Sequence, residues 1–331
     1  MKRILCFVLC LAFCAGASAC SWHKVSEVYN TDSLIAEFED YVVFKEQVEH
    51  PYLYNKHTAQ CEVFFYDPVL ELDTVTPFLY YAKELDGRVS MLTGRYSYDI
   101  YRVDLDSFHW EADRGILRVG VYNSYLGAED LFPGLHNANR TMGTFLYGYI
   151  PYVGGYIMFR SSGVFLLKGN RRTQEECLKE EDDIFQGNYA FDGRSVYYMT
   201  GNRALIALDI QTAQRTVLYE DITDFRLTEC EVLLLCGGDI WRLEPDSGKV
   251  ERLISGAEGL LGYTDEYIYY RNSERLCRAN RNGSASEVLP VEGNFYSIGL
   301  VSDPQCLFFY GKDGLSRCNY DGTDVTVIQA D

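Results

Sequence analysis

The sequence has few of the residues on which metal and redox chemistry depend. It contains only five histidines in 331 residues and no Cys-x-x-Cys pair, so a zinc site has no support. It also lacks Gly-x-Ser-x-Gly, His-Glu-x-x-His and the phosphate-binding Gly-x-x-x-x-Gly-Lys-Ser/Thr. The usual signatures of nucleophilic hydrolysis, zinc proteolysis and nucleotide hydrolysis are therefore missing. We expect no catalytic residue, no metal ligand and no cofactor.

Basic residues are also scarce. The chain has 30 Lys and Arg against 48 Asp and Glu, which gives a net charge of −18. Such an excess repels phosphate backbones and anionic lipid headgroups, so nucleic acid is excluded as a partner and direct adsorption to a membrane is disfavoured. With 47% hydrophobic and 15% aromatic residues the chain can bury a large core, and its tyrosines and phenylalanines favour strands.

Long apolar runs are absent except at the N-terminus. Residues 1–19 are typical of a signal peptide, with basic residues at 2–3, an apolar segment at 4–15 and small residues at 16–19. Cys20 follows Ala17-Ser18-Ala19, and this segment resembles a bacterial lipobox, in which the cysteine is acylated and becomes the N-terminus. The alternative is an ordinary signal peptide, because the same small residues direct cleavage at the same bond. In either case we expect an exported protein.

The body of the chain has seven cysteines, an odd number that excludes a complete intrachain set of disulfides unless Cys20 takes part. We expect most of them to be small buried hydrophobic side chains. An exported location permits a bridge from Cys318 to Cys277 or Cys306, and spacing alone does not decide whether it forms.

Short aromatic or aliphatic runs recur along the chain. Successive runs start 35 to 41 residues apart, a period typical of propeller blades of four short strands. The runs are FLYY at 78, VGVY at 119, YIMF at 156, VYYM at 196, VLLL at 232, YIYY at 267 and LFFY at 307.

Two further strips follow most of these runs at steady offsets. The second begins eight or nine residues after the run, as two antiparallel strands with a tight turn would require. It alternates with period two and ends at a polar residue suited to closing a turn. The second strips start at 165, 205, 240, 276 and 315, and third strips start at 215, 249, 286 and 324. One more strand between units would complete four strands per repeat.

These features predict an all-β fold: a single closed β-propeller of about seven four-stranded blades, with six or eight as alternatives. Gly, Asn and Asp interrupt the units every eight to ten residues, which excludes a helical array. The predicted organisation is a signal peptide at 1–19, a tether at 20–35 and a propeller at 36–331. Residues 37–48 are predicted to be one extra strand that pairs with the last blade and closes the ring.

The last two units also carry a family resemblance. YIYYRNSERLCRANRNG at 267 and LFFYGKDGLSRCNYDG at 307 resemble the repeat of bacterial exported β-propellers of unknown function. That repeat is related in pattern to the YWTD propellers of the low-density lipoprotein receptor family, in which an aromatic strand precedes an L-x-R-x-N/D-x-D-G strand and turn. No Tyr-Trp-Thr-Asp occurs here, so the interblade contacts of the receptor propellers are not carried over.

The first two units depart most from the repeat, and insertions in propellers form loops on the two faces. The segment 126–143 replaces a regular second strip in the second unit. We predict a binding loop there, with Glu129, Asp130, His136, Asn137 and Arg140 as candidate residues.

Fold alone does not decide function. The missing motifs favour a non-catalytic module that binds or scaffolds a protein or glycan partner at the cell surface. The alternative is an enzyme that acts on glycans through carboxylates converging on the central channel. We expect a monomer that faces outward and meets the membrane only through a lipid on Cys20, or a secreted protein if Cys20 is not acylated.

Overall fold

β-Strands are the only regular secondary structure among the described residues, which therefore include no helix that could cross a membrane. The structure is a computed structural model. It describes residues 29–30, 35–38, 40–45, 51–63, 69–75, 78–84, 98–104, 129–130, 146–152, 155–160, 162–168, 174–181 and 183–328.

The described strands form seven antiparallel sheets, numbered here as blades in chain order. Blade 1 contains β2 (Ile35–Phe38), β3 (Tyr41–Lys45), β4 (Pro51–Asn55) and β5 (Cys61–Val63). Blade 2 contains β6 (Val69–Val75), β7 (Phe78–Glu84), β8 (Tyr98–Asp104) and β9 (Glu129–Asp130). Blade 3 contains β10 (Leu146–Tyr152), β11 (Gly155–Arg160), β12 (Gly163–Lys168) and β13 (Gln174–Glu180).

The remaining four blades are the most regular. Blade 4 contains β14 (Ile184–Phe191), β15 (Ser195–Thr200), β16 (Leu205–Asp209) and β17 (Arg215–Tyr219), and it gains β1 (Tyr29–Asn30) at its inner edge. Blade 5 contains β18 (Ile222–Leu227), β19 (Val232–Cys236), β20 (Asp239–Leu243) and β21 (Val250–Ser255). Blade 6 contains β22 (Gly259–Tyr263), β23 (Tyr267–Asn272), β24 (Arg275–Asn280) and β25 (Glu287–Val288). Blade 7 contains β26 (Gly293–Val301), β27 (Cys306–Gly311), β28 (Gly314–Asn319) and β29 (Thr326–Val327).

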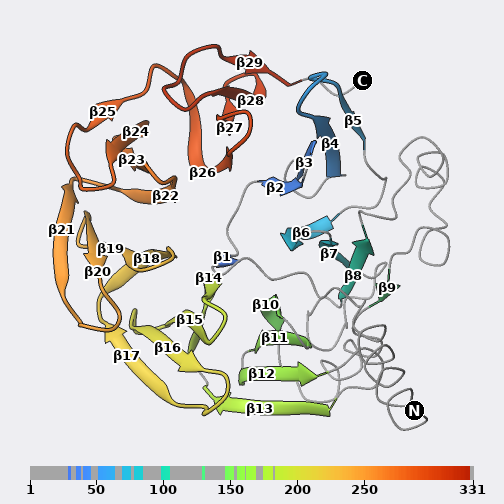
Figure 1. The fold of residues 1–331 in the computed structure, drawn as a ribbon, viewed down its shortest axis with the longest axis vertical. Coiled ribbons are helices and arrows are strands. Elements are labelled where there is room, and N and C mark those ends of the chain that lie inside the picture. The colour runs from blue at the N-terminus through green and yellow to red at the C-terminus, as the bar shows by residue number, and fades with distance from the viewer. Residues whose placement is uncertain are drawn as a thin grey trace, which may run out of the picture.

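The blades are arranged radially, with the first strand of each towards the centre and the last at the rim (Figure 1). Neighbouring inner strands contact one another in the order β10, β14, β18, β22, β26, β2 and β6. The first blade of the sequence therefore lies beside the last.

The core lies between adjacent blades rather than at one central point. Separate clusters of buried side chains fill the spaces between blades 4 and 5, 5 and 6, 6 and 7, and 7 and 1. The second strand of a blade is covered on both faces, which is why VLLL at 232 and LFFY at 307 are continuous apolar runs that are buried throughout, apart from half-buried Tyr310.

Six of the seven predicted runs form the second strands of blades 2 to 7. The remaining run, VGVY at 119, lies outside the described residues. The second strand of blade 1 is β3, which none of the predicted runs covers. The predicted extra strand at 37–48 is wrong. Its described residues turn back after Phe38, which pairs with Tyr41, and belong to two strands of blade 1. Asp40 lies at this turn, where the chain reverses. Blade 1 therefore meets blade 7 through side chains and not through a shared sheet.

The predicted tether at 20–35 contains ordered strand residues at its far end, because β1 pairs with β14. The permitted bridge from Cys318 is absent, since Cys277, Cys306 and Cys318 are all in the thiol form. These three and Cys61 are buried, as expected of small hydrophobic side chains. Burial raises the pKa of Cys306 to about 11 and that of Cys318 to about 12, so both thiols stay protonated at neutral pH.

Candidate functional site

The turns of the blades lie on two opposite faces because the strands alternate in direction. We call one the first-turn face; it carries the turns between first and second strands and between third and fourth strands. In blade 6 these turns are residues 264–266 and 281–286, and the Arg281 N–H donates to the Glu266 carbonyl across them. We call the other the second-turn face; it carries the turns between second and third strands and the links between blades.

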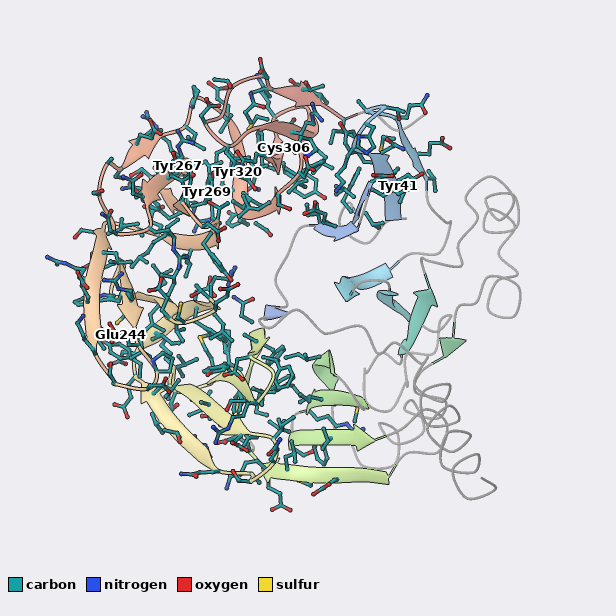
Figure 2. The ribbon with its side chains drawn as sticks, in the orientation of Figure 1. Tyr41, Glu244, Tyr267, Tyr269, Cys306 and Tyr320 are labelled. Carbon is teal, nitrogen blue, oxygen red and sulfur yellow. The ribbon has the colours of Figure 1, made fainter. Side chains whose placement is uncertain are left out.

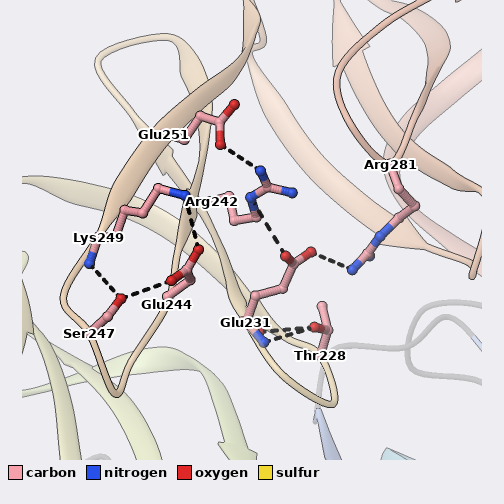
Figure 3. A network of polar contacts seen from close by, with 8 residues as sticks. All are labelled: Thr228, Glu231, Arg242, Glu244, Ser247, Lys249, Glu251 and Arg281. Atoms are coloured by element: carbon pink, nitrogen blue, oxygen red, sulfur yellow. Dashed lines mark hydrogen bonds and ion pairs between the residues drawn. The ribbon is translucent and has the colours of Figure 1, made fainter.

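A polar network on the first-turn face joins blades 5 and 6 (Figure 3). The Glu231 carboxylate accepts a hydrogen bond from Arg281 of blade 6 at 2.5 Å, and Arg242 of blade 5 lies 3.8 Å from it. Arg281 also lies over the Tyr263 ring, 5.0 Å from its centroid. Because Glu231 is bound by two arginines and little exposed, we read this network as a structural clamp rather than a catalytic site.

Tyr267 and Tyr269 of blade 6 and Tyr320 of blade 7 lie where the two blades meet (Figure 2). The Tyr320 carbonyl of blade 7 accepts hydrogen bonds from the Tyr269 hydroxyl at 3.2 Å and from Arg278 at 3.0 Å. Arg278 lies over the Tyr267 ring at 4.4 Å. Arg278 is the arginine of the repeated L-x-R-x-N strip, and that recurrence was the sequence signal for this interblade contact.

The arginine at the same place in blade 7 makes the contact to blade 1. Arg317 donates to the Tyr54 hydroxyl at 2.7 Å, and the Tyr54 ring meets Phe308 edge-on at 5.6 Å. Both aromatic residues belong to one buried cluster with Ile35 and Leu315. The two ends of the chain are thus held together by a shared core and a polar contact.

The direction of β1 is opposite to that of β14. β1 lies on the inner edge of β14, towards the centre of the radial blades (Figure 1). Tyr29 pairs with Phe191, the last residue of β14 before the first-turn face, and Asn30 pairs with Ala190 one step deeper. β1 therefore begins with Tyr29 at the first-turn end of β14 and runs towards the second-turn face.

Bulges change two inner strands near the second-turn face. Between paired positions, β14 spans five steps against two on β15, and β26 spans four against one on β27. Each bulge thus holds three extra residues and exposes an aromatic side chain: Phe185 at 48% and Tyr296 at 74%. Bulges of this kind re-aim side chains and are common next to functional sites.

Of these two exposed aromatic side chains, Tyr296 is held in position by more of its neighbours. The preceding Phe295 points inward and packs on Phe309 with ring centroids 5.7 Å apart, which holds the bulge in place. The Arg271 guanidinium of blade 6 lies 5.0 Å from the Tyr296 ring centroid. Arg271 is itself bound to Glu258, whose N–H donates to the Arg271 carbonyl at 2.7 Å and whose carboxylate lies 3.9 Å from Nε. Tyr296, Arg271 and Glu258 are our candidate site.

Of the candidate residues predicted from the sequence, the structure describes two, and the others lie outside the described residues. Glu129 and Asp130 form β9, a short outer strand paired with Arg102 and Tyr101 of β8, and not a loop. They extend the sheet because β8 offers an edge at that point. His136, Asn137, Arg140 and Cys20 lie outside the described residues. No group of three or more His, Cys, Asp or Glu among the described residues is placed to hold a metal ion.

No pattern in the sequence singles out Tyr296. Its segment, GNFYSIG, has the same aromatic character as the buried strands, and the chain holds 27 tyrosines. Whether such a residue is buried depends on the pairing register of β26 with β27, which is set only in the folded sheet.

No family model and no curated protein matches the chain. Solved structures do match it. The extracellular domain of BT4673 from B. thetaiotaomicron has a TM-score of 0.55 and 11% identity over 88% of this chain and 41% of that one. PorZ, a surface component of the type-IX secretion system of Porphyromonas gingivalis, has a TM-score of 0.56 and 13% identity, over 90% and 38%.

A third match extends over nearly the full length of the matched domain. The β-propeller domain of Cps50 (Swd1) from Myceliophteria thermophila has a TM-score of 0.54 and 12% identity over 87% of this chain and 97% of that domain. The chain spans about two fifths of the length of the first two proteins. At such low identity the likeness concerns the fold alone. The fold is a β-propeller.

Proposed function

We propose that this protein is an exported β-propeller, anchored by a lipid on Cys20, that binds a protein or glycan partner at the bacterial cell envelope without catalysing a reaction. In this proposal seven blades close into one ring, with blade 2 meeting blade 3, and the repeat is related in pattern to the YWTD propellers. The likeness to an extracellular domain and to a surface component of a secretion system supports an exported location.

The direction of β1 is the observation that carries the proposal. Cys20 precedes Tyr29 by nine residues, which span about 30 Å at most when fully extended. Because β1 begins at the first-turn face, we expect an acyl chain on Cys20 to hold that face towards the membrane. The second-turn face, with Tyr296, is then directed away from the membrane and open to a partner.

The charge of the first-turn face agrees with this role. Its described turns carry eleven carboxylates against four Lys and Arg, so this face has no tendency to adsorb to anionic lipids. The carboxylates are Asp40, Asp192, Glu229, Glu231, Glu244, Asp246, Asp265, Glu266, Asp303, Asp321 and Asp324, and the bases are Lys56, Arg194, Lys249 and Arg281. A spacer of eight residues can hold such a face beyond the screening length of about 8 Å at physiological salt.

The enzyme alternative has less support. It requires carboxylates that converge on the channel from several inner strands. On inner strand β18, Asp224 accepts hydrogen bonds from Asn188 at 2.6 Å and from Arg226 at 3.0 Å, which suits a carboxylate that joins blades. We therefore favour binding over catalysis.

Replacing Cys20 should separate anchoring from folding. In cells grown with a labelled fatty acid, we expect the wild-type protein to carry the label and to sediment with membranes. Cys20→Ser should lose the label and appear in the soluble exported fraction with an unchanged circular-dichroism spectrum. A wild-type protein without label would refute the lipid anchor and leave a secreted propeller.

Photo-crosslinking from the two faces should locate the partner. We expect a protein with p-benzoylphenylalanine in place of Tyr296 to give a discrete adduct in intact cells. The matched variant carries the same group in place of Glu229, which is exposed on the first-turn face. Adducts only from position 229 would contradict the orientation, and adducts from neither position would contradict the binding role.

A further inference from the structure

Tyr296 is an isolated exposed aromatic side chain. The other large hydrophobic residues exposed in the described part of the chain are Phe185 on β14, three blades away, and valines on or beside the outer strands at the rim: Val217, Val288, Val325 and Val327. Among the residues that the structure describes, no apolar patch therefore surrounds Tyr296. A protein interface of ordinary size needs a contiguous desolvated core, which a single ring does not supply.

The ring is nevertheless held in one orientation before any ligand arrives. Phe295 anchors the bulge in the core, the Arg271 guanidinium lies against one face of the ring, and Glu258 holds Arg271 in turn. Fixing a side chain in its bound position lowers the entropic cost of binding.

The chemistry around the ring is polar. One ring face rests on Arg271, while 74% of the residue remains exposed, so the other face is open to solvent. The Glu258 side chain is 51% exposed and offers hydrogen-bond acceptors, and Asn294 on the same bulge is also exposed. A flat electron-rich face bordered by acceptors and an amide matches a pyranose ring, whose C–H groups stack on the aromatic face while its hydroxyls bond to polar groups.

Charge restricts the class of sugar further. Arg271, the cation against the ring, is paired with Glu258, and the whole chain carries a net charge of −18, so we expect an acidic sugar such as a uronic or sialic acid to bind more weakly than a neutral one. We propose that Tyr296, supported by Arg271 and Glu258, is the stacking platform for a neutral sugar ring of a glycan on the second-turn face. This proposal rests on the proposed binding function and names the chemistry of the partner.

The test uses the soluble chain from residue 21 and a panel of neutral tetrasaccharides built from glucose, mannose, galactose or N-acetylglucosamine, measured by calorimetry. An acidic tetrasaccharide of galacturonic acid is the charge control. We expect at least one neutral probe to bind and Tyr296→Ala to weaken it about tenfold or more, because stacking is lost. Tyr296→Phe should bind within about twofold of wild type, since the ring and not the hydroxyl makes the contact.

Phe185→Ala is the matched control, because it removes the exposed aromatic of the other bulge. It should leave the affinity unchanged. Absence of binding by every neutral probe, tighter binding of the acidic probe, or equal losses from Tyr296→Ala and Phe185→Ala would each overturn the proposal. None of these results depends on fatty-acid labelling of Cys20 or on adducts at position 296, so failure of the sugar site and failure of the proposed function can be told apart.

Discussion

Gly283→Ala should lower the free energy of unfolding by about 3 kcal/mol or more, through strain and a backbone clash together. Gly283 lies in the turn of blade 6 with φ +78°, a region that side chains with a Cβ rarely adopt. A Cβ there would lie 2.2 Å from the Leu253 carbonyl oxygen of blade 5. Because the obstacle is backbone, no rotamer change can relieve it, and the two blades must separate.

The same turn in blade 5 provides a matched control. Gly248 has φ +69°, but a Cβ at this position meets no atom within 4 Å. Gly248→Ala should therefore cost only the conformational strain, about 1 kcal/mol. At Gly322 of blade 7 a Cβ would lie 2.8 Å from Pro290 Cδ. The loss of unfolding free energy for Gly322→Ala should therefore lie between those of Gly283→Ala and Gly248→Ala. Urea unfolding of the three variants gives the order, and equal losses would mean that blades 5 and 6 are not packed as described.

Gly299→Val should lower the free energy of unfolding by about 2–3 kcal/mol, because overpacking forces blades 7 and 1 apart. A Cβ at Gly299 of β26 would lie 2.5 Å from Ile35 Cγ1 and within 2.8 Å of two more atoms of that side chain. Ile35 belongs to β2 and is only 5% exposed, so its side chain has little room to move.

The double variant tests this contact directly. Ile35→Ala removes three carbon atoms and Gly299→Val adds three, so the pair conserves volume. We expect the double variant to be more stable than the sum of the single losses predicts, by about 1 kcal/mol or more. Gly259→Ala, whose Cβ would make an ordinary 3.6 Å contact with Arg271, should combine additively with Ile35→Ala. Additivity in both pairs would show that the first and last blades do not meet in solution.

Much of the fold can be predicted from the sequence where neighbouring blades impose the same pattern. YIYY at 267 and LFFY at 307 are continuous because both faces of β23 and β27 are covered by the next blades, so burial leaves a direct trace in the residues. The sequence pattern does not identify blade 1 as a repeat unit, because YVVF at 41 is followed by PYLYN and not by an L-x-R-x-N strip. Its partner contacts lie more than 250 residues away in the sequence, beyond any local pattern.

The candidate site could not be predicted for a different reason. Tyr296 and Phe295 are adjacent aromatics, and only the bulge between Asn294 and Ile298 decides that one is buried and the other exposed. Arg271 reaches Tyr296 from the neighbouring blade, so the support for the ring is non-local as well. By contrast, Arg278 and Arg317 recur in the repeat, and a search for repeated charges on buried strips would have found their interblade contacts.

The pairing of β1 with β14 also sets an order in time. Tyr29 can pair with Phe191 only after more than 160 further residues have been synthesised. Ile35 of blade 1 likewise packs against Gly299 of blade 7. Blades 5 to 7 need only close neighbours and can form early, whereas contacts so distant in sequence form slowly. The N-terminal residues, which are synthesised first, would therefore be among the last to reach their final place in the fold.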